Sequence, residues 1–153
     1  MLTNNFIKYL LFLLPWFISS ILFKSSTMYY ESLSLPFFAI PSYLFGIVWT
    51  ILYILIAISI FIVYENSNKE YKKYLLINFI SNQLFTSFFF TLRNNFLSLI
   101  DVIVTLISAI YLYNETKLQN KKASYFLIPY IIFSIYALLL ILSINILNWF
   151  KCI

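Results

Sequence analysis

The chain has 153 residues, of which 63% are hydrophobic, 22% aromatic and only 10% charged, which lies outside the range of soluble globular domains. Its net charge of +5 does not indicate a nucleic-acid surface, because the basic residues are spread over short gaps between apolar runs. With no histidine, one cysteine and five acidic residues, we expect neither a metal site nor an obligatory cofactor.

Five apolar runs are long enough to cross a bilayer, whose hydrocarbon core of about 30 Å needs about 20 helical residues. Helices are expected because an unclosed strand leaves its backbone groups unpaired in lipid. No small-residue cleavage site follows the first run, so we expect a true span there rather than a signal peptide. The sequence predicts a single all-α membrane domain over residues 1–153, a five-helix bundle with helices at 6–23, 41–64, 73–92, 96–113 and 123–150.

The distribution of basic residues predicts the orientation, since loops rich in lysine and arginine stay in the cytoplasm. Five spans place the two termini on opposite sides of the membrane. One side carries only Lys24, Arg93 and Lys151, whereas the other carries Lys8, Lys69, Lys72, Lys73, Lys117, Lys121 and Lys122. We therefore expect the N-terminus in the cytoplasm, with the C-terminus and the first loop outside.

The first loop, 24–40, is the longest connection between the predicted spans. It mixes polar residues with Met28, Tyr29, Tyr30, Phe37 and Phe38, and is too apolar for a freely solvated linker. Two readings remain open: a lid that folds over the mouth of the bundle, or an interfacial loop whose aromatic rings rest among the headgroups.

The second predicted span carries an aromatic stripe. Phe45, Trp49 and Tyr53 stand at i, i+4 and i+8, so they share one helix face on which a flat aromatic ligand could stack. Judged by composition alone, helix packing or an interfacial belt is the commoner role for such residues.

The third predicted span places Asn78, Asn82, Phe85 and Phe89 on one face. Two amides facing lipid would be costly, so this face is expected to point into the bundle.

In the fourth predicted span, Asp101 begins a polar stripe that continues at Thr105 and Ser108. A carboxylate inside the membrane is a candidate functional group. Because Arg93 lies about two helical turns away, capping or charge pairing near the helix start is an equal alternative.

The fifth predicted span contains Pro129, which lacks an N–H and should kink or loosen the helix near its entrance. Further along, Phe133 and Ala137 lie one turn apart, and the small side chain of Ala137 lets another backbone or a ligand approach closely. No nucleophile–base pair, paired carboxylates or glycine-rich phosphate loop can be assembled from the sequence, so no catalytic residue is named.

These residues resemble the translocator protein, or tryptophan-rich sensory protein, family, also called the peripheral-type benzodiazepine receptors. The family signature F-x-x-V-W-T-x-L-Y matches Phe45, Val48, Trp49, Thr50, Leu52 and Tyr53 in register. The third-helix signature corresponds to the segment from Asn78 to Phe90, and the fifth-helix signature to the segment from Pro129 to Asn148.

The resemblance implies a five-helix bundle in a bacterial cell membrane, often a homodimer, with a pocket under the first loop. Family members bind porphyrins, including protoporphyrin IX and haem, and isoquinoline or benzodiazepine-like drugs. Carried over by position, the ligand-binding residues are Tyr30, Trp49, Tyr53, Asn82, Phe85, Phe133 and Ala137. This agreement favours a ligand-binding role for Trp49 and Tyr53 over packing alone.

Three departures from the family pattern bear on function. The family tryptophans of the third and fifth helices are Phe85 and Phe133 here, and a family asparagine is Ile141. Phenylalanine keeps a flat apolar wall but loses the indole N–H and the readily oxidised ring. The sequence therefore favours a receptor-like protein that binds a planar apolar ligand, with transport of porphyrin-like or sterol-like compounds and light-dependent porphyrin degradation as alternatives.

Overall fold

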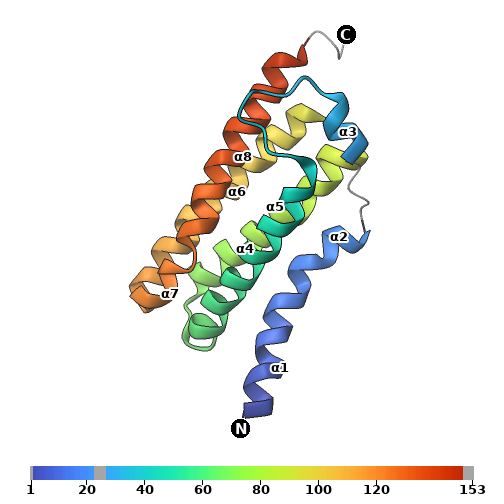
Figure 1. The fold of residues 1–153 in the computed structure, drawn as a ribbon. Coiled ribbons are helices and arrows are strands. Elements are labelled where there is room, and N and C mark those ends of the chain that lie inside the picture. Colours follow the sequence, from blue (N-terminus) through green and yellow to red (C-terminus); the bar gives the residue numbers. More distant parts are fainter. Residues whose placement is uncertain (1, 23–26, 150–153) are drawn as a thin grey trace.

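The computed structural model describes residues 2–22 and 27–149, and all regular secondary structure in these ranges is helical. The helices form an elongated bundle, with the start of α1 (Leu2–Leu13) and the end of α8 (Ile128–Leu147) at opposite ends (Figure 1). Four helical segments are long and apolar enough to cross a membrane: Asn4–Leu22, Ser42–Asn66, Asn95–Gln119 and Lys121–Leu147. An all-helical membrane protein, as expected from composition, is confirmed.

The first span is not one continuous α-helix. After α1 the chain tightens into a 3₁₀ turn, η1 (Leu14–Phe17), and continues as α2 (Ile18–Leu22). Pro15 lies in this turn, where its missing N–H and its ring interrupt the α-helical hydrogen bonds. The predicted last residue of this span, Phe23, lies outside the described residues, as do Lys24, Phe150 and Lys151.

The second span agrees closely with its prediction. Pro41 precedes the first turn of α4 (Ser42–Val63), which ends in a 3₁₀ turn, η2 (Tyr64–Asn66). Proline suits this position because an N–H group at the start of a helix has no acceptor within the helix, so the N–H that proline lacks is not missed.

The third predicted span, 73–92, corresponds to α5 (Lys69–Thr86) and a π-helical turn, η3 (Ser87–Thr91). The helix begins before Lys73 because the Asn68 side chain caps it, accepting the Tyr71 N–H at 2.7 Å. Segment α5 is not among the four apolar spans, since charged residues occupy its first turns and amides its buried face. The count of five spans is therefore not confirmed and stays a prediction.

The predicted end of the fourth span at Tyr113 is wrong, because α6 (Asn95–Gln119) continues for more than a further turn. The residues of α6 beyond Tyr113 can remain helical for two reasons. The Thr116 hydroxyl donates to the Leu112 carbonyl, and the positive charge of Lys117 lies near the negative C-terminal end of the helix dipole. The fifth span is divided into α7 (Lys121–Tyr125) and α8 by a turn at 126–127. This is the break expected near Pro129, which lies in the first turn of α8.

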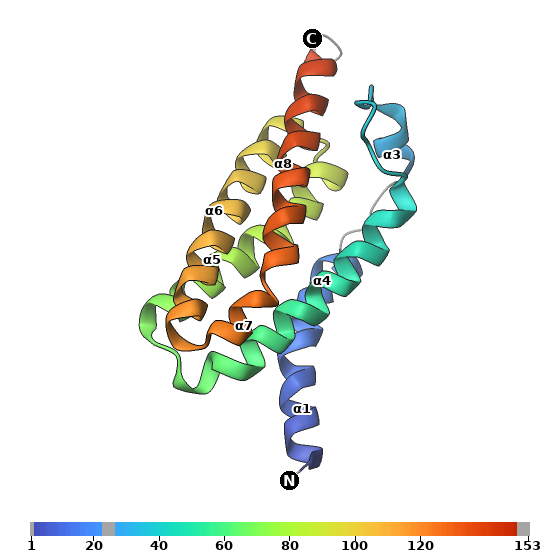
Figure 2. The ribbon, with the colours of Figure 1, turned by 60° about the vertical axis from the view of Figure 1, so that its left-hand side comes forward.

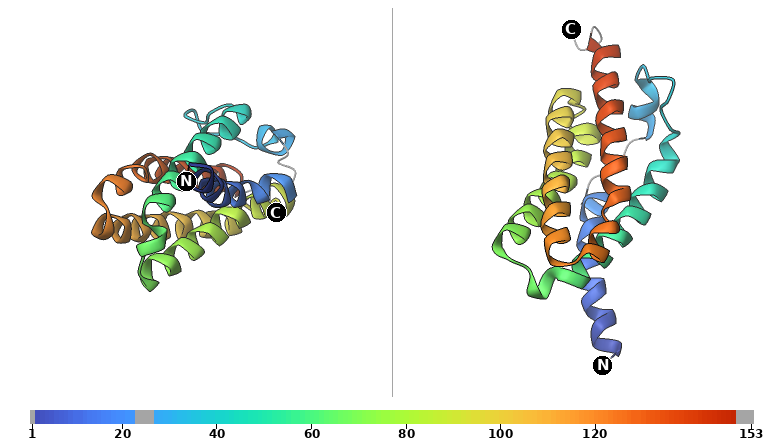
Figure 3. Two further views of the ribbon diagram at one scale, coloured as in Figure 1. Left: turned by 90° about the horizontal axis from the view of Figure 1, so that it is seen from below. Right: turned by 90° about the vertical axis from the view of Figure 1, so that its left-hand side faces the viewer.

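The helices pack closely at one end and diverge at the other. Segment α6 lies between α5 and α8, whereas α4 crosses near α7 and runs away from α8 towards α3 (Thr27–Ser32), as Figures 2 and 3 show. We call the tightly packed part, near α7, the closed half; its core includes Trp16, Leu52, Ile56, Ile60, Val63, Tyr71, Ala109, Leu112 and Leu127. The part near α3 is the open half, with a core of Tyr30, Phe89, Val102, Leu140, Ile141 and Ile144.

Candidate ligand-binding site

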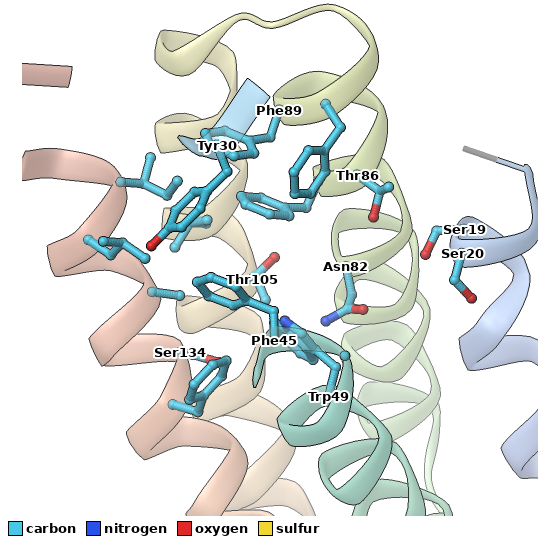
Figure 4. A pocket seen from close by; sticks show the side chains of 18 of the residues that line it. Ser19, Ser20, Tyr30, Phe45, Trp49, Asn82, Thr86, Phe89, Thr105 and Ser134 are labelled. Atoms are coloured by element: carbon cyan, nitrogen blue, oxygen red, sulfur yellow. The ribbon is translucent and has the colours of Figure 1, made fainter. Parts of the chain in front are cut away.

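A cavity of about 280 Å³ lies in the open half beneath α3, between α4, α5, α6 and α8 (Figure 4). Its surface is mainly apolar, with aromatic rings as the largest side chains, and eight serine and threonine residues and the amide of Asn82 also border it. All seven residues expected from the sequence to bind a ligand line this one cavity: Tyr30, Trp49, Tyr53, Asn82, Phe85, Phe133 and Ala137. Whether they bind a ligand stays a prediction.

Trp49 forms the centre of the wall between α4 and α8. Its ring lies 5.5 Å from that of Phe133, at an interplanar angle of 88°, and 5.5 Å from that of Tyr53, at 35°. One turn earlier on α4, Gly46 also lines the cavity, and a Cβ atom built there meets nothing within 4 Å. The wall is therefore open beside Trp49.

Tyr53 is less available to a ligand than the aromatic stripe suggests. Its side chain is only 8% exposed, and its ring packs against Trp16, Phe17 and Trp49. The sequence interpretation did not identify Trp16 as a core residue. We conclude that Tyr53 supports the wall from behind and offers little of its ring to a stacked ligand.

The opposite wall comes from the end of α5 and the π-helical turn. The rings of Phe85 and Phe89 stack nearly parallel, at 11° and 5.5 Å, and Phe90 also lines the cavity. A π turn inserts an extra residue into the helix, which helps bring both Phe89 and Phe90 to the cavity. The regular spacing used for the sequence prediction identified Phe89 but not Phe90.

A hydrogen-bond network crosses the bundle at the floor of the cavity. The Tyr53 hydroxyl donates to Asn82 Oδ1 at 2.9 Å, and the Asn82 amide lies 3.4 Å from the Tyr130 hydroxyl. Tyr130 donates in turn to Asn78 Oδ1 at 3.0 Å, and Asn78 Nδ2 reaches the Thr105 carbonyl and the Ser108 hydroxyl. Both amides are buried, which confirms that this face of the third predicted span points into the bundle.

One sequence interpretation gave Asp101 a capping or charge-pairing role near the start of its helix, and the structure contradicts it. The cap of α6 is Asn94, whose side chain accepts the Leu97 N–H, and the Arg93 guanidinium lies over the Tyr29 ring. Asp101 instead points towards α5, where its Oδ1 accepts a hydrogen bond from Ser81 at 2.8 Å. The alternative of charge pairing with Arg93 is therefore wrong.

Segment α3 and the residues after it close the cavity from above, as the lid interpretation expected. Tyr30 is buried, lines the cavity and donates to the Ile40 carbonyl at 2.9 Å. Burial, reinforced by nearby Tyr136, raises the pKa of Tyr30 to about 12, so the phenol stays neutral. The interfacial alternative fits only Met28 and Phe37, whose side chains are exposed.

Two side chains of α8 fasten the lid. Asn148 accepts the Ser34 N–H at 2.9 Å and donates to the Ser34 carbonyl at 3.0 Å. The Tyr136 hydroxyl accepts the Ile40 N–H and donates to the Phe38 carbonyl. We call these two contacts the latch.

The sequence interpretation missed the contribution of the first span to the cavity. Phe17, Ser19 and Ser20 line the side near α5, as Figure 4 shows for the two serines. The 3₁₀ turn frees the N–H of Ser19, which donates to Gln83 Oε1 at 2.8 Å. The signal available in the sequence was a pair of serines about one helical turn after the proline of an otherwise apolar run.

Comparisons with known proteins agree with this architecture. The family model described as TspO/MBR family matches residues 8–147. Tryptophan-rich protein TspO of Bacillus cereus is 33% identical over 136 residues, covering 85% of this chain and 89% of the relative. The uncharacterized membrane protein YtaB of Bacillus subtilis is 36% identical over 131 residues, covering 83% of this chain and 84% of the relative.

A third relative comes from an archaeon. Tryptophan-rich protein TspO of Archaeoglobus fulgidus is 32% identical over 132 residues, covering 82% of this chain and 83% of the relative. The match of the family model over most of the chain, with three relatives that each align over more than 80% of both chains, shows that the chain belongs to the TspO/MBR family.

Proposed function

We propose that the protein is a receptor-like membrane protein that binds a planar, mainly apolar ligand of the porphyrin or tetrapyrrole class in the cavity beneath α3. The observation that carries the proposal is the wall itself: aromatic rings from α3, α4, α5 and α8 surround one cavity whose surface is mainly apolar. Such a wall suits a flat aromatic ligand, with a small number of polar contacts to orient it.

The size of the cavity bears on how such a ligand would fit. About 280 Å³ lies just below the range for small-molecule sites, which is about 300–1,000 Å³. A compact isoquinoline or benzodiazepine-like molecule is the easier fit with the lid in place. For a whole tetrapyrrole, the lid must move outward or part of the ring must stay outside the cavity.

Stacking and one amide would supply the recognition. Trp49, Phe85 and Phe133 offer apolar ring surface, and each is only partly buried. Asn82 keeps part of its amide for a ligand, since its oxygen is engaged by Tyr53 while its nitrogen has only the long contact to Tyr130.

Titration of the purified protein in lipid nanodiscs with protoporphyrin IX tests the proposal, with the porphyrin absorption band as the signal. We expect saturable binding that Trp49→Ala weakens by about tenfold or more, equivalent to about 1.4 kcal/mol. Ile51→Ala is the matched control on the same helix, because Ile51 is 54% exposed and does not line the cavity. Absence of saturable binding, or equal affinities for Trp49→Ala and Ile51→Ala, would overturn the proposal.

The orientation and the assembly complete the proposal. We infer a cytoplasmic N-terminus from the basic residues, and the Lys8 ammonium contacts Glu65 at 2.6 Å, at the end of the bundle where α5 begins. By family resemblance we expect a homodimer in the bacterial cell membrane. A fluorescent reporter at the C-terminus that is bright in the cytoplasm would contradict the orientation, and a single-subunit mass in native detergent complexes would contradict the dimer.

A further inference from the structure

The carboxyl group of Asp101 lies inside the bundle in surroundings that do not match an ionised acid. Asp101 is 6% exposed and belongs to one of the four apolar spans. Its Oδ1 accepts from the Ser81 hydroxyl at 2.8 Å, whereas its Oδ2 is buried and has no hydrogen-bond partner in the described part of the chain. An ionised carboxylate there would leave Oδ2 without a hydrogen-bond donor in the described part of the chain.

The neighbouring hydroxyl groups cannot supply the missing donors. Ser81 Oγ lies 2.8 Å from Asp101 Oδ1, 3.0 Å from the Asp101 carbonyl and 2.7 Å from Thr105 Oγ1. A serine hydroxyl has one proton and donates to one of these three oxygens at a time. An ionised Asp101 would therefore receive at most a single hydrogen bond from this group.

Positive charge is also missing around this carboxyl group. Among residues 2–22 and 27–149 no lysine or arginine forms an ion pair with Asp101, and Arg93 lies over Tyr29 instead. The titratable group that faces it from α8 is a phenol, Tyr130, and from α5 it meets the uncharged Ser81. Phenols are neutral at neutral pH, so no partner in the described part of the chain offsets the cost of burying a charge here.

A proton on Asp101 Oδ1 gives both the acid hydroxyl and the Ser81 hydroxyl an acceptor. The acid then donates to Ser81 Oγ, and the Ser81 hydroxyl donates onward to Thr105 Oγ1 or to the Asp101 carbonyl. The remaining Oδ2 becomes an uncharged carbonyl oxygen, for which the lack of a donor is much less costly. A bound sodium ion fits less well, because hydroxyl groups 2.7 Å apart already occupy the space between the oxygens.

We propose that Asp101 is a proton-binding site inside the membrane, neutral at neutral pH and connected to the cavity through Ser81 and Thr105. Thr105 and Val102, on the same helix, line the cavity, so ionisation of Asp101 would place a negative charge next to a bound ligand. The proton then determines whether a planar ligand with carboxylate groups can bind. This last step rests on the proposed function, whereas the proton site does not.

Infrared difference spectroscopy of the full chain in nanodiscs, without ligand, tests the proton site. We expect a carbonyl band of a protonated carboxylic acid at neutral pH that is lost in Asp101→Asn, a variant with nearly the shape of the neutral acid. Ser81→Ala should shift the band without removing it, because the acid O–H on Oδ1 loses the acceptor to which it donates. The matched control Glu65→Gln, at an exposed carboxylate paired with Lys8, should leave the band unchanged.

Two results would overturn the site: no such band in the wild-type protein, or a band that persists in Asp101→Asn. Stabilisation by sodium but not by potassium, lost in Asp101→Asn, would replace the proton by a bound cation and also overturn it.

A separate measurement tests the link to the ligand. We expect protoporphyrin IX to bind more weakly as pH rises, its dimethyl ester to bind equally at each pH, and Asp101→Asn to bind both without pH dependence. Equal pH dependence in the wild type and Asp101→Asn would contradict the link. If neither porphyrin binds while the infrared band is present, the proposed function fails and the proton site stands.

Discussion

The closed and open halves of the bundle share the same helices but differ in how side chains fill the space between them. In the closed half, branched aliphatic residues such as Ile56 and Leu112 are fully enclosed, together with Ala109 and Ala123. In the open half, flat rings such as those of Tyr30 and Phe45 meet nearly edge to face. Side chains in the closed half fill the space between the helices, as close packing requires, whereas the helices of the open half diverge and the rings on them line a cavity.

The polar network marks the boundary between the two halves. Asn78, Asn82 and Tyr130 tie α5 to α6, α4 and α8 immediately beneath the cavity. Interhelical hydrogen bonds in membranes average only about 0.6 kcal/mol each, but several at one level fix how far α4 can approach its neighbours. The cavity thus depends on the spacing of the helices as well as on the residues that line it.

The largest effect is expected from truncation within the closed half. Ile56→Ala should lower the free energy of unfolding by about 2–5 kcal/mol, because it leaves a new void in a filled core. Ile141→Ala in the open half should cost only about 1–2 kcal/mol, because this side chain borders an existing cavity and loses fewer contacts. SDS titration of both variants in detergent micelles measures the difference, and equal losses would contradict the contrast between the halves.

An intermediate effect is expected from enlarging one alanine in each half. Ala109→Leu should destabilise the protein by about 1–3 kcal/mol, because Ala109 is enclosed and has no space for the added carbons. Ala137→Leu should leave thermal stability unchanged or raise it, since the side chain can extend into the cavity, and it should weaken porphyrin binding by about tenfold. Normal ligand affinity in a folded Ala137→Leu variant would place the ligand elsewhere.

The smallest effect is expected at the latch. Tyr136→Phe removes the hydroxyl that accepts from Ile40 and donates to Phe38, and should cost about 0.5–1.5 kcal/mol locally. Hydrogen exchange should then become faster at residues 33–41 and stay unchanged in the closed half. Uniformly faster exchange throughout the bundle would show that the lid does not open independently.

Spacing in the sequence predicted the inward face of each helix, and the family resemblance joined these faces into one pocket. Trp49, Asn82 and Ala137 were placed from regular intervals within their own helices, and the structure brings them to one cavity. Their distances from one another depend on how neighbouring helices are shifted along their axes, which no interval within a helix specifies. For the same reason the contact of Asp101 with Ser81, from a different helix, was not foreseen.

Other features escaped prediction for local reasons. Phe17 reaches the cavity because the first span breaks near Pro15, and Phe90 reaches it through a π turn that regular spacing does not anticipate. Hydropathy also misplaced the end of α6, since a polar segment can continue a helix beyond the apolar run. Polar residues also leave α5 outside the set of apolar spans, because its first turns are charged and its buried face carries amides.

The latch has a consequence for how the lid can vary among related chains. Asn148 and Tyr136 hold Ser34, Phe38 and Ile40 through backbone N–H and carbonyl groups, and the lid's own side chains at these positions take no part in those bonds. The lid sequence can therefore diverge, and with it the surface offered to an incoming molecule, while the closed position is preserved. At these three positions the constraint falls on Asn148 and Tyr136, so a lineage that changes either residue should hold the lid less tightly even with an identical lid.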